Sequence, residues 1–131
     1  VNSIRLVAST FSLSGIAEAA AIAAWNEPEY SQFILDQNAI ERSRVIKGLR
    51  DMGYKPMESV TNFVACDVKR PAADIVKAMR SRGVRISTVS GPAIDTTFGG
   101  NDFGNYIRLS MGTPADTDAF LHNLKEVLSE E

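Results

Sequence analysis

The run from Tyr106 to Pro114 (Y-I-R-L-S-M-G-T-P) constrains the fold of this chain more than any other segment. Its apolar residues Ile107, Leu109 and Met111 recur at every second position, which is the period of a strand with one buried face. Arg108 falls on the opposite face of this predicted strand. A guanidinium held in this way can bind a carboxylate through two parallel hydrogen bonds. The alternative is an arginine on the solvated face of a half-covered sheet, since arginine is mostly an exposed residue.

The rest of the chain predicts helices and short strands around this segment. The helices are expected over residues 13–25, 27–52, 71–82 and from Pro114 onward, and two further strands over 61–68 and 84–87. This order predicts an α+β two-layer domain: a small, mainly antiparallel sheet of about three strands, helices packed on one face, and a long helix before the sheet. Residues 90–105 are rich in Gly, Asp, Asn and Thr and predict a long loop of the kind that often borders a functional site.

Capping residues set the expected helix ends. Ser12 or Ser14 is expected to cap the first helix and Asn26 the long one, because their side-chain oxygens accept otherwise unpaired backbone N–H groups. Gly53 is expected to end the long helix in a left-handed conformation. Thr113 is expected to cap the last helix.

Composition and charge argue against several classes of protein. The 131 residues suit one domain, and 44% hydrophobic with 23% charged residues is ordinary for a globular chain. A net charge of −2, with 14 Lys+Arg spread among 16 Asp+Glu, argues against a nucleic-acid-binding surface. The longest apolar stretch, Ile16–Trp25, is too short to span a bilayer, so no membrane partner is expected. A single cysteine, Cys66, excludes an intramolecular disulfide and fits a reducing, cytoplasmic location.

The residues by themselves predict neither catalytic machinery nor a metal site. His122 is the only histidine, and it lies far in sequence from Cys66, with no metal-ligand spacing around either residue. A Cys/His nucleophile pair stays open as an alternative, but the apolar strand around Cys66 favours a buried, inert thiol. The charged residues of the long helix are interpreted as a solvated face: Glu41, Arg42, Arg44, Lys47, Arg50 and Asp51.

Three segments, in this order, resemble the C-terminal part of the fold-type I aminotransferases that use pyridoxal phosphate (PLP). The resemblance is to the histidinol-phosphate aminotransferases among them. The first segment is F-S-L-S-G-I-A-E-A-A-A-I-A-A-W-N-E-P-E-Y (residues 11–30) and the second is S-V-T-N-F-V-A-C-D-V (59–68). The third joins R-G-V-R-I-S to Y-I-R-L-S-M-G-T-P, and together the segments cover roughly residues 10–128.

The resemblance implies roles for two residues. In that family the arginine at the position of Arg108 binds the α-carboxylate of the amino-acid substrate, and the asparagine at the position of Asn62 lies near the substrate side. The parent enzyme would use PLP and act on an amino acid or a 2-oxo acid. No lysine of this chain lies in a Ser-x-x-Lys context like that of the family's Schiff-base lysine. The resemblance therefore implies no bound cofactor, no catalytic residue and no turnover for this chain alone.

The resemblance also implies a division of the chain. Residues 1–12 would be an arm or a remnant of the large domain, 13–53 a helical segment with a long interdomain-type helix, and 54–131 the α+β small domain. The leading hypothesis is a small-domain fragment of a PLP-dependent aminotransferase, inactive alone, that supplies the substrate-carboxylate arginine.

Two alternatives stay open. One is a free-standing α+β module that binds a small carboxylate without catalysis. The other is a chain that only assembles, because an uncovered Ala-rich helix favours a homodimer.

Overall fold

The computed structural model describes residues 13–89 and 103–129. The predicted arm at 1–12 and most of the predicted loop at 90–105 lie outside the described residues. The chain divides into two compact units, residues 1–35 and 36–131. Within the described ranges, no helix combines the length and the apolar character needed to cross a membrane.

The first unit contains helix α2 (Gly15–Trp25), and the predicted cap Ser14 is confirmed. The Ser14 hydroxyl accepts a hydrogen bond from the backbone N–H of Ala17 at 3.2 Å. The prediction for Asn26 is wrong: its backbone N–H bonds back to carbonyls of α2, so Asn26 ends that helix. The next helix begins two residues later, at Pro28.

Helix α3 (Pro28–Asp51) ends where the sequence predicts, at a glycine with a positive φ angle. Gly53 has φ 88°, a conformation that a side chain would strain. The N–H of Tyr54 reaches back to the carbonyl of Leu49 at 3.0 Å, which closes a Schellman motif and satisfies the helix end. Gly83, with φ 80°, ends helix α4 (Ala72–Ser81) in the same way.

Three short strands form one antiparallel sheet in the order β1-β3-β2. They are β1 (Phe63–Asp67), β2 (Ser87–Thr88) and β3 (Tyr106–Ser110), so the strand that carries Arg108 is central. The second strand was expected over 84–87 but begins later. Its predicted first residue, Val84, donates its N–H to Met79 and thereby still belongs to the end of α4.

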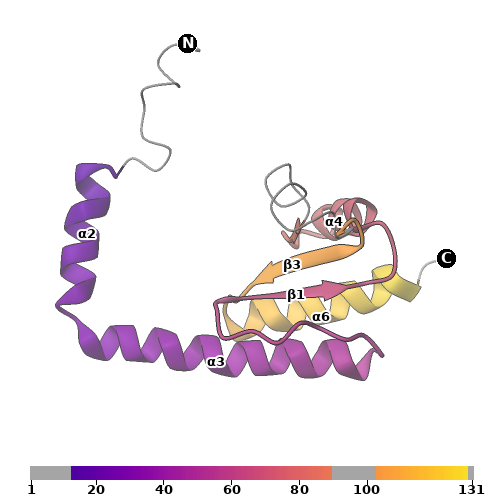
Figure 1. Ribbon diagram of the computed structural model, residues 1–131, viewed down its shortest axis with the longest axis horizontal. Coiled ribbons are helices and arrows are strands. Elements are labelled where there is room, and N and C mark those ends of the chain that lie inside the picture. The colour runs from indigo at the N-terminus through magenta and orange to yellow at the C-terminus, as the bar shows by residue number, and fades with distance from the viewer. Residues whose placement is uncertain (1–12, 90–102, 130–131) are drawn as a thin grey trace, which may run out of the picture. The chain divides into compact units, whose positions relative to one another are not determined.

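One face of the sheet packs against α3, α4 and the last helix, α6 (Pro114–Ser129). Figure 1 shows α6 running behind β1 and β3. The buried apolar core is shared by all of these elements: Val45, Leu49, Val64, Cys66, Val68, Ala72, Ile75, Met79, Ile107, Phe120, Leu124 and Val127. The predicted α+β architecture, with a three-stranded antiparallel sheet after a long helix, is therefore confirmed.

Candidate functional site

Arg108 lies at the middle of the central strand, on the sheet face opposite the helices. Its strand neighbours Ile107 and Leu109 turn toward the core cluster, whereas Arg108 is exposed. The residues directly across from it are small: Ala65 on β1 and Ser87 on β2. The side chain therefore stands on an open part of the sheet with little bulk on either side.

The Arg108 guanidinium is held by an aromatic ring. Its Cζ atom lies 4.1 Å from the centroid of the Phe63 ring, well within the range of a cation–π contact. Among the residues that the structure describes, no carboxylate pairs with Arg108 and no group accepts a hydrogen bond from it. The N–H donors at the edge of the guanidinium are thus available to a ligand.

Asn62, the second predicted site residue, lies one position before β1 and is exposed. Its backbone carbonyl accepts a hydrogen bond from the N–H of Met111 at 2.8 Å, which extends the pairing of the two strands. Arg108 is paired with Ala65, three residues further along, or about 10 Å at the rise of a strand. Asn62 therefore lies just before the strand that pairs with the Arg108 strand, and in the described residues no hydrogen bond joins the two side chains.

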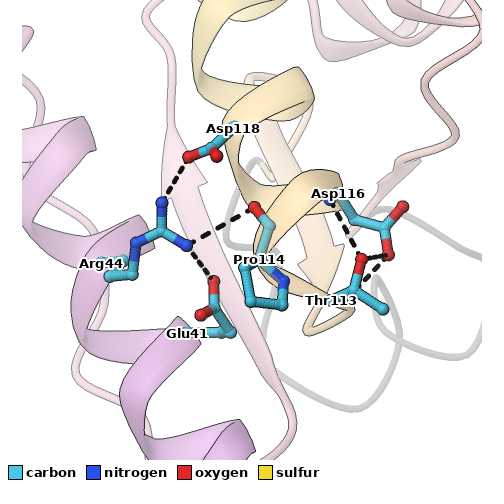
Figure 2. A network of polar contacts seen from close by, with 6 residues as sticks. All are labelled: Glu41, Arg44, Thr113, Pro114, Asp116 and Asp118. Atoms are coloured by element: carbon cyan, nitrogen blue, oxygen red, sulfur yellow. Dashed lines mark hydrogen bonds and ion pairs between the residues drawn. The ribbon is translucent and has the colours of Figure 1, made fainter.

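A polar network connects α3 to the start of α6, directly after the Arg108 strand (Figure 2). Arg44 Nη1 lies 2.7 Å from Oε2 of Glu41, and its Nη2 pairs with Asp118. Nη1 also donates to the carbonyl of Pro114 at 3.4 Å. Burial by itself would lower the pKa of the Arg44 guanidinium, but hydrogen bonds and charges of Asp118 and Glu41 outweigh it and raise that pKa.

This network overturns part of the solvated face that the sequence predicts on the long helix. Glu41 is only 1% exposed, whereas Lys47 and Asp51 are exposed as expected. Glu41, Val45 and Leu49 follow one another at intervals of four residues, so Glu41 lies on the buried stripe. That spacing is the signal that could have found it.

A capping box fixes the other side of the same helix start. The Thr113 backbone N–H and hydroxyl donate to Asp116 Oδ2 at 2.8 Å and 2.7 Å, and the Asp116 N–H donates to the Thr113 hydroxyl at 3.3 Å. The predicted cap is therefore confirmed. The side-chain hydrogen bond from Thr113, followed by its backbone one, lowers the pKa of Asp116.

The structure does not support the alternative in which Cys66 and His122 form a nucleophile pair. Cys66 is buried in the core, and burial, followed by the charge of Asp67, raises the pKa of its thiol to about 11. His122 is exposed on α6, with Nε2 lying 3.5 Å from Glu126. The described part of the chain contains no cluster of three or more His, Cys, Asp or Glu side chains that would suit a metal ion.

Comparison with known proteins shows the family. Residues 1–124 match the family model for aminotransferase class I and II, so the chain belongs to this family. Histidinol-phosphate aminotransferase 3 of Rhizobium meliloti (strain 1021) is 32% identical over 117 residues, which are 89% of this chain and 29% of that protein. The histidinol-phosphate aminotransferase of Streptomyces avermitilis is 30% identical over 131 residues, all of this chain and 32% of that protein.

A solved structure agrees with these relatives. The histidinol-phosphate aminotransferase of Sinorhizobium meliloti, determined in complex with pyridoxal-5'-phosphate, is 28% identical, with a TM-score of 0.73 over 97% of this chain and 33% of that chain. The chain therefore spans about a third of the length of the proteins that it matches.

Lys69, in a pocket beside the sheet, is poorly suited to hold PLP as a Schiff base. A Schiff base needs a lysine that gives up its proton readily. A pocket of about 420 Å³ is lined by Gly53, Tyr54, Lys55, Asp67, Lys69 and Tyr106. Its Lys69 is ion-paired with Asp67, and this hydrogen bond raises the pKa of the ammonium group, which favours the charged form that cannot react.

Proposed function

We propose that this chain is the small-domain part of a PLP-dependent aminotransferase and that Arg108 binds the α-carboxylate of its substrate. The observation that carries the proposal is the state of Arg108. It is an exposed guanidinium on the central strand, with its Cζ over the Phe63 ring and no acidic partner among the described residues. Other arginines in the described residues do have acidic partners, as Arg44 has Glu41 and Asp118 and Arg50 has Glu58.

The substrate class follows from this geometry together with the family. A planar guanidinium with free edge donors suits a carboxylate, which amino acids and 2-oxo acids share. The relatives are named histidinol-phosphate aminotransferases, and histidinol phosphate itself has no carboxylate. The proposed carboxylate-bearing substrates of the parent enzyme are therefore a 2-oxo acid, the amino acid that corresponds to it, or an aromatic amino acid. Asn62 would border the same substrate. The parent enzyme would be cytoplasmic, and assembly as a homodimer belongs to the same proposal.

PLP would supply the electron sink for transamination in the parent enzyme. This chain contributes the carboxylate anchor and is inactive by itself. The test is to mix the 131-residue chain with PLP and to look for an aldimine absorbance band that borohydride removes. We expect neither such a band nor transfer of an amino group. A band of this kind, or measurable turnover, would contradict the proposal.

The role of Arg108 is tested by Arg108→Lys in a full-length enzyme that carries this segment. Lysine keeps the charge but cannot form two parallel hydrogen bonds, and a charge-assisted hydrogen bond contributes about 1.5–3 kcal/mol. We expect KM for a carboxylate-bearing substrate, an aromatic amino acid or a 2-oxo acid, to rise roughly tenfold or more. The matched control is Arg50→Lys, because Arg50 is an exposed arginine that pairs with Glu58. An unchanged KM in Arg108→Lys would refute the assignment.

A further inference from the structure

The geometry points to Phe63 as the positioning residue of Arg108: its ring fixes the plane of the guanidinium so that a carboxylate can approach only along the edge. This inference rests on the proposed function, since it takes Arg108 as the carboxylate anchor. Three observations support this role: the register of β1 and β3, the distance between Arg108 and the Phe63 ring, and the hydrogen bonds that hold the Phe63 backbone.

The register places the two side chains on one face of the sheet. Phe63 is paired with Ser110, and Ala65 with Arg108, so Phe63 and Arg108 are diagonal neighbours on adjacent strands. Such pairs lie about 7–8 Å apart at their backbones, within reach of long and aromatic side chains. The direct neighbours of Arg108, Ala65 and Ser87, are too small to support a guanidinium. The aromatic ring is therefore the support that this face offers.

The contact is of a kind that leaves the binding groups free. The Arg108 Cζ atom lies 4.1 Å from the ring centroid, so the ring touches the side chain without using a hydrogen-bond donor. The five N–H donors of arginine lie in the plane of the guanidinium. An ion pair would instead occupy those donors. A ring beneath one face directs an incoming carboxylate to the edge, where two parallel hydrogen bonds form.

Phe63 is in turn anchored by a hydroxyl clamp at the start of β1. Its carbonyl accepts hydrogen bonds from the hydroxyls of Ser59 at 2.6 Å and Thr61 at 3.2 Å. Its N–H donates to the Thr61 hydroxyl at 3.3 Å. Arg42 of α3 donates to the Thr61 carbonyl at 2.8 Å, which ties the clamp to the long helix. The ring thus rests on a fixed segment of backbone.

The experiment uses the 131-residue chain and NMR of the Arg108 side chain. The Nε–Hε signal is assigned by its loss in Arg108→Lys, and acetate serves as the carboxylate probe. Stacking on a ring moves this proton signal upfield. We expect the upfield position in the wild type and in Phe63→Tyr, and its loss in Phe63→Leu. Because an exposed cation–π contact contributes about 0.5–1 kcal/mol, the acetate Kd should rise roughly two- to fivefold in Phe63→Leu and return to the wild-type value in Phe63→Tyr.

Two controls separate positioning from packing. Tyr106→Leu removes a ring from the same face, where Tyr106 stacks edge-on against Phe103 at 5.1 Å, and should leave the Arg108 signal unchanged. Phe63→Met, a second ring-free variant, is expected to behave as Phe63→Leu does, and the amide spectrum verifies that each variant is folded.

The inference is overturned if Phe63→Leu and Phe63→Met keep both the upfield signal and the acetate Kd of the wild type. A different result would refute the proposed function instead. If Arg108→Lys binds acetate as tightly as the wild type, Arg108 is not the carboxylate anchor, whatever the ring does to its signal.

Discussion

The Cys66 thiol is buried in the core, and the rate at which it reacts measures that burial directly. Burial raises its pKa from 9.0 to about 11. Only the thiolate reacts, so two pKa units correspond to a roughly hundredfold lower reactive fraction at pH 8. We expect iodoacetamide to modify the folded chain roughly a hundredfold more slowly than the chain in urea. Because Cys66 is the only cysteine, the label reports this site alone. Equal rates would show that the thiol is accessible and would revive the nucleophile alternative.

The buried Glu41 carboxylate depends on Arg44. In Arg44→Met the carboxylate stays buried but loses its ion pair, and leaving a buried polar group unsatisfied costs about 1–3 kcal/mol. Urea denaturation should therefore show a lower free energy of unfolding for this variant. Lys47→Met is the matched control, since Lys47 makes an exposed ion pair with Asp51 on the same helix. Such pairs contribute little. Equal losses in both variants would contradict a structural role for the network.

At the scale of single residues, the sequence predicts the face of Arg108 but not the burial of Glu41. The alternation around Arg108 has a period of two, which by itself decides which side chains leave the core. Glu41 has the helical spacing of a core residue, but its charge suggests solvent. Its charge is compensated by Arg44, which is itself held by Asp118, 74 residues further along the chain. A long-range contact of that kind leaves no mark in the local pattern.

The start of helix α6 should lose stability in acid because of its capping box. The folded-state pKa of Asp116 is lowered, so its contribution is present above the unfolded value, 3.8, and is lost as the pH falls through the lowered folded value. We expect the wild type to be more stable than Asp116→Asn at pH 7, and the difference to shrink below about pH 4. Urea denaturation of both proteins across pH 2–7 measures it.

A double-mutant cycle attributes this effect to the cap. In a Thr113→Val background the hydroxyl that donates to Asp116 is absent, so Asp116→Asn should cost less and depend less on pH. If the pH dependence is the same in both backgrounds, the capping box is not its source.

Among the elements, the helices are predicted better than the short strands. Helices α3 and α4 stop just before Gly53 and Gly83, and α6 starts just after Thr113, as the sequence predicts. These positions are predictable because capping chemistry is local. The strand β2 has only the two residues Ser87 and Thr88, and its position follows from pairing with Arg108 and Ile107 of β3. Pairing between residues so distant in sequence cannot be read from the alternating segment at 84–86. The contact of Phe63 with Arg108 depends on register in the same way.

For the whole molecule, the two units differ in how many of their large hydrophobic side chains are exposed. Helix α2 has no buried residue, and eight of the eleven large hydrophobic side chains that are exposed in the described residues lie between positions 13 and 35. Unit 36–131 instead encloses its own core. The sequence predicts an uncovered Ala-rich helix, because the chain resembles only one part of a larger enzyme. It cannot predict what covers that helix.

The exposed apolar surface of α2 should make the 131-residue chain associate as its concentration rises. Trp25 is 88% and Ile16 85% exposed, and burying one large apolar side chain contributes about 1.5–3 kcal/mol. We expect light scattering to show a growing mean mass, and the double substitution Ile16→Ser with Trp25→Ser to weaken association roughly tenfold or more. Val60→Ser is the matched control, because Val60 is 93% exposed but lies outside α2. A chain that stays monomeric at every concentration, or one whose association survives the double substitution, would show that this surface does not drive assembly.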